Sequence, residues 1–213
     1  MAQQTVLPDV SRERAGAEMP DALRCFPVRI RPVGLFSDEQ FYEFCRLNSD
    51  LDIERTAQGD LLIMAPASFR SSHINLRIVL QLGRWAERDG TGVATESSGG
   101  FILPNSAMRA PDAAWIRRNR LTTVPQEQQE RFLPLCPDFA IELRSASDTL
   151  DTAQVKMSEY LDNGLRLGWL IDPFARRVYV YRPGADVDVL DDPDGVDGAP
   201  VLPGFRLNLG RIW

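Results

Sequence analysis

The hydrophobic side chains of this sequence recur at two spacings, and the wider spacing predicts three helices. The clearest helix covers residues 69–89, where one apolar stripe is formed by Ile74, Ile78, Leu82 and Trp85. Gly90 follows as a helix stop. A second helix is predicted to begin at Ser37, because the sequence Ser-Asp-Glu-Gln matches a capping box. The third helix is predicted over residues 148–163, with Asp148 or Thr149 as its cap. A further short helix is expected around residues 126–132, within a polar segment bounded by prolines.

Shorter apolar runs, alternating or continuous, predict the strands. A hairpin is expected over residues 51–64, turning at Gly59-Asp60. Further strands are predicted over residues 93–103 with a bend at Gly99-Gly100, 113–116, 139–143, 167–172, 177–182 and 201–213. The stretch 183–200 reads as a surface loop with at most one short strand. Because a predicted helix separates the strands at 139–143 and 167–172, the pattern indicates a β-α-β unit in an α/β domain with a mixed sheet.

Composition sets the limits of the predicted domain. The chain has 213 residues, of which 44% are hydrophobic and 25% charged, an ordinary globular balance. Residues 1–24 are polar and lack periodicity, so we expect a flexible N-terminal segment followed by a single domain over residues 25–213. No apolar run approaches the roughly 20 residues of a membrane helix, and the N-terminus lacks the apolar core of a secretion signal. The expected location is the cytoplasm, without a membrane partner.

The charged residues are mostly acidic, and the basic ones are almost all arginine. The net charge of −6 argues against a protein that coats nucleic acid non-specifically, although it allows a local basic rim around an acidic site. Of the 24 basic residues, 23 are arginine, and the single lysine is Lys156. An Arg-rich codon background would explain the bias, but it would not determine where the remaining lysine lies.

Two acids are the strongest candidates for chemistry. Glu142 lies inside the apolar run Phe-Ala-Ile-Glu-Leu, and a carboxylate there costs several kcal/mol unless it is paired, neutralised or bound to a cation. Asp112 begins a predicted strand directly after Pro111. Two acids from neighbouring strands and a backbone carbonyl make an oxygen site that suits Mg²⁺ or Mn²⁺. A metal there could polarise a phosphodiester and help to generate hydroxide.

Lys156 follows Glu142 by one predicted helix, and its side chain is long enough to reach back to the strand ends. Tyr160 shares that helix face, four residues on. Lysine can shift its pKa and accept a proton, which arginine effectively cannot, so a lysine at this place is consistent with a chemical requirement. The alternative is an exposed helix lysine.

Two long stretches carry a resemblance. The sequences SSGGFILPNSAMRAPDAAWIRR and CPDFAIELRSASDTLDTAQVKMSEYLDNGLRLGWLIDPFARRVYVYRPG resemble the putative restriction endonuclease family of the Uma-two type, within the PD-(D/E)xK nuclease superfamily. The likeness covers roughly residues 35–213. It implies a restriction-endonuclease-like core, in which a mixed sheet is flanked by helices and joined by additional β-hairpins, and it implies magnesium-dependent cleavage of phosphodiesters. Asp112 and Glu142 match the metal-binding acids of the family, and Leu143 would supply the backbone carbonyl.

One position departs from the superfamily pattern. The superfamily places a lysine two residues after the second acid, where this sequence has Arg144. Lys156 on the following helix matches the displaced lysine of the family. Arg144 would then contact phosphate or pair with an acid.

Other residues are weaker candidates. Glu54 is either an outer metal ligand or part of a surface ion pair, and Glu96 either approaches the metal or does not take part. His73 and Gln154 are possible accessory residues, although a lone histidine is more often structural. Five arginines either form a rim that receives a nucleic-acid backbone or pair within the protein: Arg109, Arg117, Arg118, Arg120 and Arg131.

These features predict a metal-dependent DNA endonuclease in which a metal-activated water attacks the phosphodiester. Two alternatives remain at this stage. The first is a nuclease-fold protein that binds nucleic acid or a partner without cutting. The second is a structural protein in which Arg144 neutralises Glu142. A homodimer is also expected, on the basis of a predicted exposed C-terminal strand that ends at Trp213.

Overall fold

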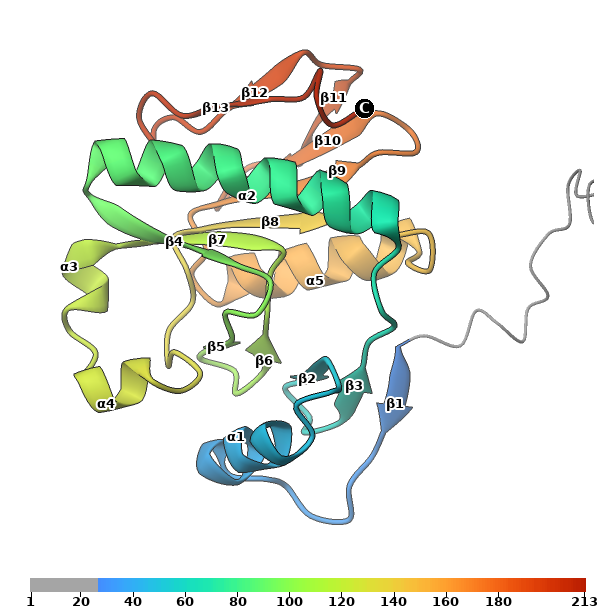
Figure 1. The fold of residues 1–213 in the computed structure, drawn as a ribbon, viewed down its shortest axis with the longest axis vertical. Coiled ribbons are helices and arrows are strands. Elements are labelled where there is room, and N and C mark those ends of the chain that lie inside the picture. The colour runs from blue at the N-terminus through green and yellow to red at the C-terminus, as the bar shows by residue number, and fades with distance from the viewer. Residues whose placement is uncertain (1–26) are drawn as a thin grey trace, which may run out of the picture.

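Two β-sheets and a hairpin form the framework of the protein in a computed structural model, which describes residues 27–213 (Figure 1). The larger sheet contains β4 (Gly92–Glu96), β7 (Ala113–Arg117), β8 (Phe139–Leu143), β9 (Leu167–Asp172), β10 (Arg177–Tyr181) and β11 (Asp188–Asp191). The smaller sheet contains β1 (Val28–Ile30), β2 (Ile53–Arg55), β3 (Leu61–Ile63), β5 (Phe101–Ile102) and β6 (Met108–Arg109). A separate hairpin pairs β12 (Gly195–Asp197) with β13 (Arg206–Asn208).

The larger sheet is mixed, with the strand order β11-β10-β9-β8-β7-β4. Only β8 and β9 run parallel among its paired strands, and helix α5 (Leu150–Asp162) connects them. This is the predicted β-α-β unit, and it places the C-terminal end of β8 beside the start of α5. The predicted α/β class, with a mixed sheet, flanking helices and additional hairpins, is confirmed.

Helices cover both faces of the larger sheet (Figure 1). The long helix α2 (Phe69–Asp89) and the β12–β13 hairpin pack on one face. There Phe205 contacts the sheet residues Phe139 and Trp169, while Trp85 of α2 contacts Trp115 and Phe205. Helix α5 packs on the other face through Met157 and Tyr160, both fully buried. Burial of each such large side chain stabilises the fold by roughly 1.5–3 kcal/mol.

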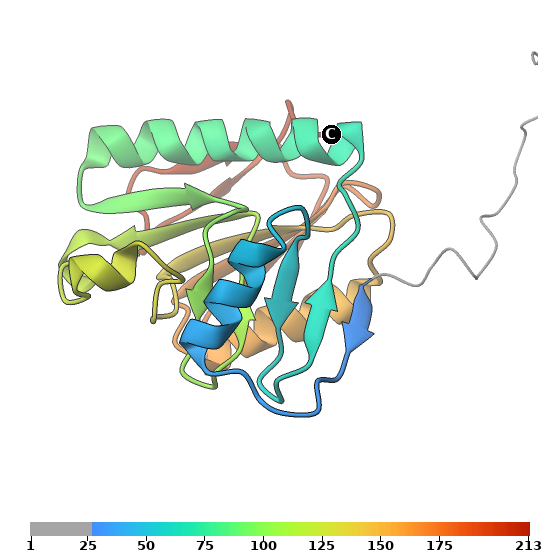
Figure 2. The same cartoon turned by 60° about the horizontal axis from the view of Figure 1, so that its bottom comes forward.

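The smaller sheet carries the N-terminal helix α1 (Asp38–Leu47), as Figure 2 shows. The predicted capping box is present, because the Ser37 hydroxyl accepts from the Gln40 N–H and the Gln40 side chain accepts from the Ser37 N–H. Phe41 on α1 is fully buried against Ile53, Leu61 and Met108 of the smaller sheet. This packing fixes strand β2, which contributes to the site described below.

Two glycines permit close approach between elements of the larger sheet. A Cβ at Gly168 would clash with the Met157 side chain, so its absence lets α5 lie directly on β9. A Cβ at Gly92 would clash with the Trp115 ring and the Ile116 carbonyl. At both positions the absence of a side chain allows neighbouring elements to pack more closely than a Cβ would permit.

Several element predictions are wrong in detail. Residues 93–103 form two strands of different sheets, because the chain turns at Ser97-Ser98, where the Gly99 N–H donates to the Glu96 carbonyl, and the Phe132 ring packs where a Gly100 side chain would stand. The stretch 183–200 contains both β11 and β12. Of the strand predicted over residues 201–213, only β13 forms. Trp213 does not extend that strand and packs against the core.

Two short helices follow β7. The first, α3 (Arg118–Leu121), was not predicted, and α4 (Gln126–Gln129) is shorter than the expected helix. The predicted flexible segment 1–24 lies outside the described residues. Within residues 27–213, none of the helices combines the length and the hydrophobicity needed to span a bilayer.

Candidate active site

Asp112 and Glu142 lie at neighbouring strand ends. The register pairs Ala113 with Ile141, which brings Asp112 next to Glu142 across β7 and β8. Asp112 Oδ2 accepts a hydrogen bond of 2.8 Å from the N–H of Leu143. Glu142 is 8% exposed although it lies in an apolar strand. The sequence argument that Glu142 needs a partner therefore holds.

Lys156 supplies that partner from α5. Its Nζ lies 2.9 Å from Glu142 Oε1 and 2.8 Å from Glu54 Oε1. Glu54 belongs to β2 of the smaller sheet and is 4% exposed, so the prediction of a surface ion pair is wrong. The only lysine of the chain thus joins two buried acids that come from two different sheets, and it is not the exposed helix lysine considered above.

Tyr160 and Arg109 surround this ion pair. The Tyr160 hydroxyl donates to Glu142 Oε1 at 2.9 Å. Arg109 Nη1 lies 3.0 Å from Glu54 Oε2, and its Nε donates to Glu159 Oε2 at 2.6 Å. The N–H of Ala110 also donates to Glu54. Each charged side chain of this cluster therefore has a partner of opposite sign, as a buried charge requires; the cluster consists of Glu54, Glu142, Glu159, Arg109 and Lys156.

The two acids at the strand ends have raised pKa values. Burial raises the pKa of Asp112 to about 6, although the hydrogen bond from Leu143 opposes the change. Burial raises the pKa of Glu142 to about 7, with Asp112 adding to the shift and Lys156 opposing it. Near neutral pH both carboxyls are therefore close to their titration points, which is common among functional carboxyls.

Glu54 and Lys156 behave differently. Burial would raise the pKa of Glu54, but Lys156 and Arg109 beside it bring that pKa below its usual value. Burial would lower the pKa of Lys156, but Glu142 and Glu54 raise it above its usual value. The ammonium group is therefore held in its charged form.

The donors at the strand ends fit a hard cation. Among residues 27–213, no three His, Cys, Asp or Glu side chains are arranged to hold a metal ion. The hydrogen bond to Asp112 uses Oδ2, and the close contacts of Glu142 use Oε1, so each acid retains a second oxygen. The Leu143 N–H points toward Asp112, and in an extended strand the carbonyl of the same residue faces the same side. Two carboxylate oxygens and one carbonyl match Mg²⁺ or Mn²⁺, which keep several waters.

Arg144 and Glu96 do not contact the cluster. Arg144 Nη1 lies 2.8 Å from Asp172 Oδ2, and its guanidinium lies over the Phe174 ring. The reading in which Arg144 neutralises Glu142 is therefore wrong, because strand β9 supplies its acid. Glu96 ends β4 opposite Ala113, and it is exposed.

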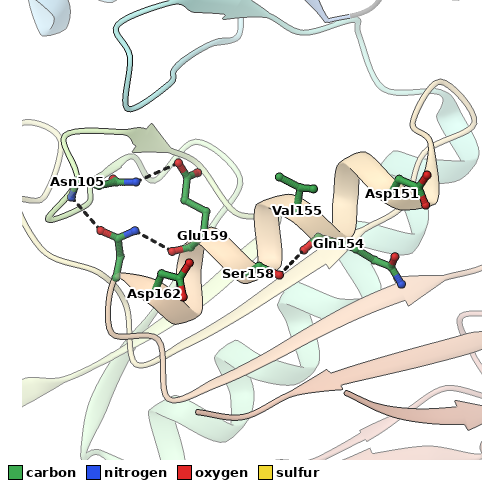
Figure 3. Close-up of a pocket in the computed structure, with 8 residues that line it drawn as sticks. Asn105, Asp151, Gln154, Val155, Ser158, Glu159 and Asp162 are labelled. Atoms are coloured by element: carbon green, nitrogen blue, oxygen red, sulfur yellow. Dashed lines mark hydrogen bonds between the residues drawn. The ribbon is translucent and has the colours of Figure 1, made fainter. Parts of the chain in front are cut away.

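His73 and Gln154 also lie elsewhere. His73 is exposed on α2, where Nε2 accepts from Arg77. Gln154 lines a shallow groove on the outer face of α5, together with Asn105 and Glu159 (Figure 3). In that groove Asn105 donates to Glu159 at 3.1 Å. The groove therefore abuts the residue that holds Arg109 and does not itself contain the acids at the strand ends.

Sequence reasoning missed Glu159 and the inner role of Arg109. Glu159 lies three residues after Lys156, the spacing of one helix face, and this signal could have identified it. The proposed arginine rim is contradicted at Arg109, which is buried, and at Arg120, which pairs with the buried Asp138. Intramolecular pairing is the correct reading for these two.

Comparisons with known proteins identify the family and the fold of the chain. The model of the Uma2 family, described as "Putative restriction endonuclease", matches residues 38–210. A crystal structure at 1.96 Å of a putative nuclease belonging to DUF820 from Anabaena variabilis ATCC 29413 has the same fold. Its TM-score is 0.68 at 20% sequence identity, over 83% of this chain and 97% of that chain. No curated protein matches the sequence. The family match spans most of the chain, and the chain therefore belongs to the Uma2 family of putative restriction endonucleases.

Proposed function

We propose that the protein is a metal-dependent endonuclease that hydrolyses phosphodiester bonds of DNA. The observation that supports this most strongly is the meeting of Asp112, Glu142 and Lys156 at the C-terminal end of β8. Membership of a restriction endonuclease family makes nucleic acid the natural substrate. The three residues are those that the sequence alone singled out.

Asp112, Glu142 and the Leu143 carbonyl would hold Mg²⁺ or Mn²⁺. A bound ion of this kind polarises the phosphodiester and lowers the pKa of water, so that hydroxide forms near neutral pH. Ionised Asp112 and Glu142 would bind the ion, and their raised pKa values mean that binding it releases protons.

Lys156 would act as a fixed cation. Since its pKa is raised, it stays protonated, which argues against a role as general base. A protonated ammonium next to Glu142 can orient the attacking water and stabilise the negative charge that develops on the phosphoryl oxygens. Glu54 and Tyr160 would position Lys156 and Glu142 without touching the substrate.

The decisive experiment measures cleavage of plasmid DNA by the purified full chain. We expect cleavage with Mg²⁺ or Mn²⁺ and none with EDTA. Lys156→Ala should lower the rate by about 100-fold or more, because Glu142 loses the cation that pairs with it. Ser158→Ala, on the exposed face of the same helix, serves as the matched control and should cleave normally.

A second variant guards against misfolding. Removing Lys156 leaves two buried acids unpaired, so folding is checked by circular dichroism. Asp112→Asn keeps an oxygen for the Leu143 N–H and should fold, yet lose cleavage. Normal cleavage by both variants would refute the proposed site.

The non-cutting alternative has one observation in its favour, namely that no three-acid metal cluster occurs in the described part of the chain. Calorimetry separates the two functions. The proposed enzyme binds Mg²⁺ or Mn²⁺ near millimolar concentration, and Asp112→Asn weakens that binding. No metal binding by the wild type, with retained affinity for DNA, would establish the alternative.

A further inference from the structure

The outer face of helix α2 differs in charge from the rest of this acidic chain. Residues 61–86 contain Arg70, Arg77 and Arg84 but no Asp or Glu, whereas the whole chain carries a net charge of −6. The three arginines are seven residues apart, so they share one helix face and repeat about every 10 Å along it. None of them forms a salt bridge with an acid among residues 27–213.

An aromatic pair lies at the start of the same face. Phe69, the first residue of α2, is 89% exposed, which is unusual for so large an apolar side chain. The rings of Phe69 and His73 are stacked, with centroids 6.2 Å apart and planes 6° from parallel. Arg77 Nε donates to His73 Nε2 at 2.8 Å, so the arginine row continues directly from the aromatic pair.

This face begins at the same end of the molecule as the candidate active site. In Figures 1 and 2, the first turn of α2 lies at the same end of the molecule as the C-terminal end of β8, where Glu142 is found. The outer groove of α5 offers no comparable surface, because Asp151, Glu159 and Asp162 line it and would repel phosphate (Figure 3). Of these two surfaces, the arginine row on α2 is therefore the one that favours a polyanion.

We propose that the outer face of α2 binds single-stranded DNA, with an unpaired base stacked on Phe69 and His73 and the backbone following Arg70, Arg77 and Arg84. A base stacks on an exposed ring only when it is not already stacked in a duplex, and each such contact stabilises binding to a degree that does not depend strongly on sequence. The row of arginines and the exposed aromatic ring match the two components of single-strand recognition, which are a basic track for the backbone and a stacking surface for the bases. The inference rests on the proposed function, since it names the substrate class on which that function acts.

The test measures fluorescence anisotropy of a labelled oligonucleotide, single-stranded or annealed to its complement, with full-length protein in EDTA so that no cleavage occurs. We expect the single strand to bind more tightly than the duplex. Phe69→Ala should weaken single-strand binding by about tenfold and leave duplex binding nearly unchanged. Leu47→Ala, which removes another highly exposed apolar side chain on α1 (74%), is the matched control and should change neither affinity.

The arginines are tested through salt dependence. Arg77→Gln should reduce the slope of log affinity against log salt by roughly 0.7 for the single strand, whereas Arg46→Gln on α1 should not. Wild-type single-strand affinity in Phe69→Ala would overturn the proposal. A second result would also overturn it. If Phe69→Ala lowered the oligomeric mass of the protein in solution and left its DNA affinity unchanged, the face would bind a second copy of the chain and not DNA. Because binding is measured without cleavage, these results are independent of whether Lys156→Ala abolishes the nuclease activity.

Discussion

Lys156 lies between two carboxylates whose burial would be costly without it. Glu54 and Glu142 are both under 10% exposed, and each places Oε1 within 3 Å of Nζ. Removal of one partner from such a group typically costs several kcal/mol, because the remaining charge keeps its desolvation penalty. A residue proposed for catalysis thus also stabilises the fold, and variants at Lys156 must be read with both effects in mind.

Tyr160→Phe isolates a single hydrogen bond of the cluster. The variant removes the donor to Glu142 Oε1 within a fully buried side chain, and we expect a loss of about 1 kcal/mol in the free energy of unfolding. Urea denaturation at pH 7 measures it. Tyr42→Phe removes an exposed hydroxyl that donates to the Glu130 carbonyl, and it should change stability by less than half as much. Equal effects of the two substitutions would contradict the assignment.

The three principal site residues could be named from the sequence because each carried a local signal. Glu142 interrupted an apolar strand, Lys156 was the only lysine, and Asp112 matched a family motif. The residues that pair with Lys156 and Glu54 could not be named from the sequence in the same way. Glu54 and Arg109 meet Lys156 only through the packing of two sheets, and no local pattern records that contact.

At the scale of elements, the predictions succeeded where periodicity was long. Helices α2 and α5 and strands β8 and β9 match their predicted ranges closely, because each buries a regular apolar stripe or run. Predictions failed after position 183 and around residue 99. There the strands are two to five residues long, and their direction depends on turns and on pairing partners that the sequence does not reveal.

A matched pair of glycine substitutions tests the packing of the larger sheet. Gly92→Ala would drive a Cβ into the Trp115 ring and the Ile116 carbonyl, neither of which can move freely, so we expect a loss of about 1–3 kcal/mol. Gly83→Ala lies within α2 with open space around the new Cβ, and it should raise stability by about 0.5–1 kcal/mol. Thermal denaturation of the two variants should shift the midpoint in opposite directions. Shifts of the same sign would show that the described packing is wrong at one of the two positions.

The whole molecule joins two sheets at one site. The larger sheet holds Asp112 and Glu142, while the smaller one contributes Glu54, and Lys156 on α5 binds both. Packing of α1 against β2 therefore influences the site from a distance, through Phe41 and Ile53.

Stability of the metal-free protein should fall as the pH rises from 5 to 8. Asp112 and Glu142 have folded-state pKa values of about 6 and 7, above the values of about 4 expected in the unfolded chain. The folded state therefore binds their protons more tightly, and this contribution is present at low pH and is lost as the pH passes 6 and 7. The combined loss should be on the order of 4 kcal/mol, because each pH unit between 5 and the folded-state pKa corresponds to about 1.4 kcal/mol, one unit for Asp112 and two for Glu142.

Urea denaturation in EDTA across that range measures the effect. The double variant Asp112→Asn, Glu142→Gln cannot titrate at these positions, and its stability should vary less with pH. Parallel curves for the variant and the wild type would show that these two carboxyls titrate normally. Added Mg²⁺ should restore the wild type most strongly at high pH, where both acids are ionised.

The ion pair between Glu54 and Lys156 also bears on how the protein is made. Glu54 lies on the second strand and Lys156 on the last helix, so during translation the acid leaves the ribosome long before the lysine that binds it. Strand β9, on which α5 packs, emerges later still. A nascent chain that ends before β9 therefore cannot complete the cluster, so the proposed DNA-cutting activity would appear only late in synthesis.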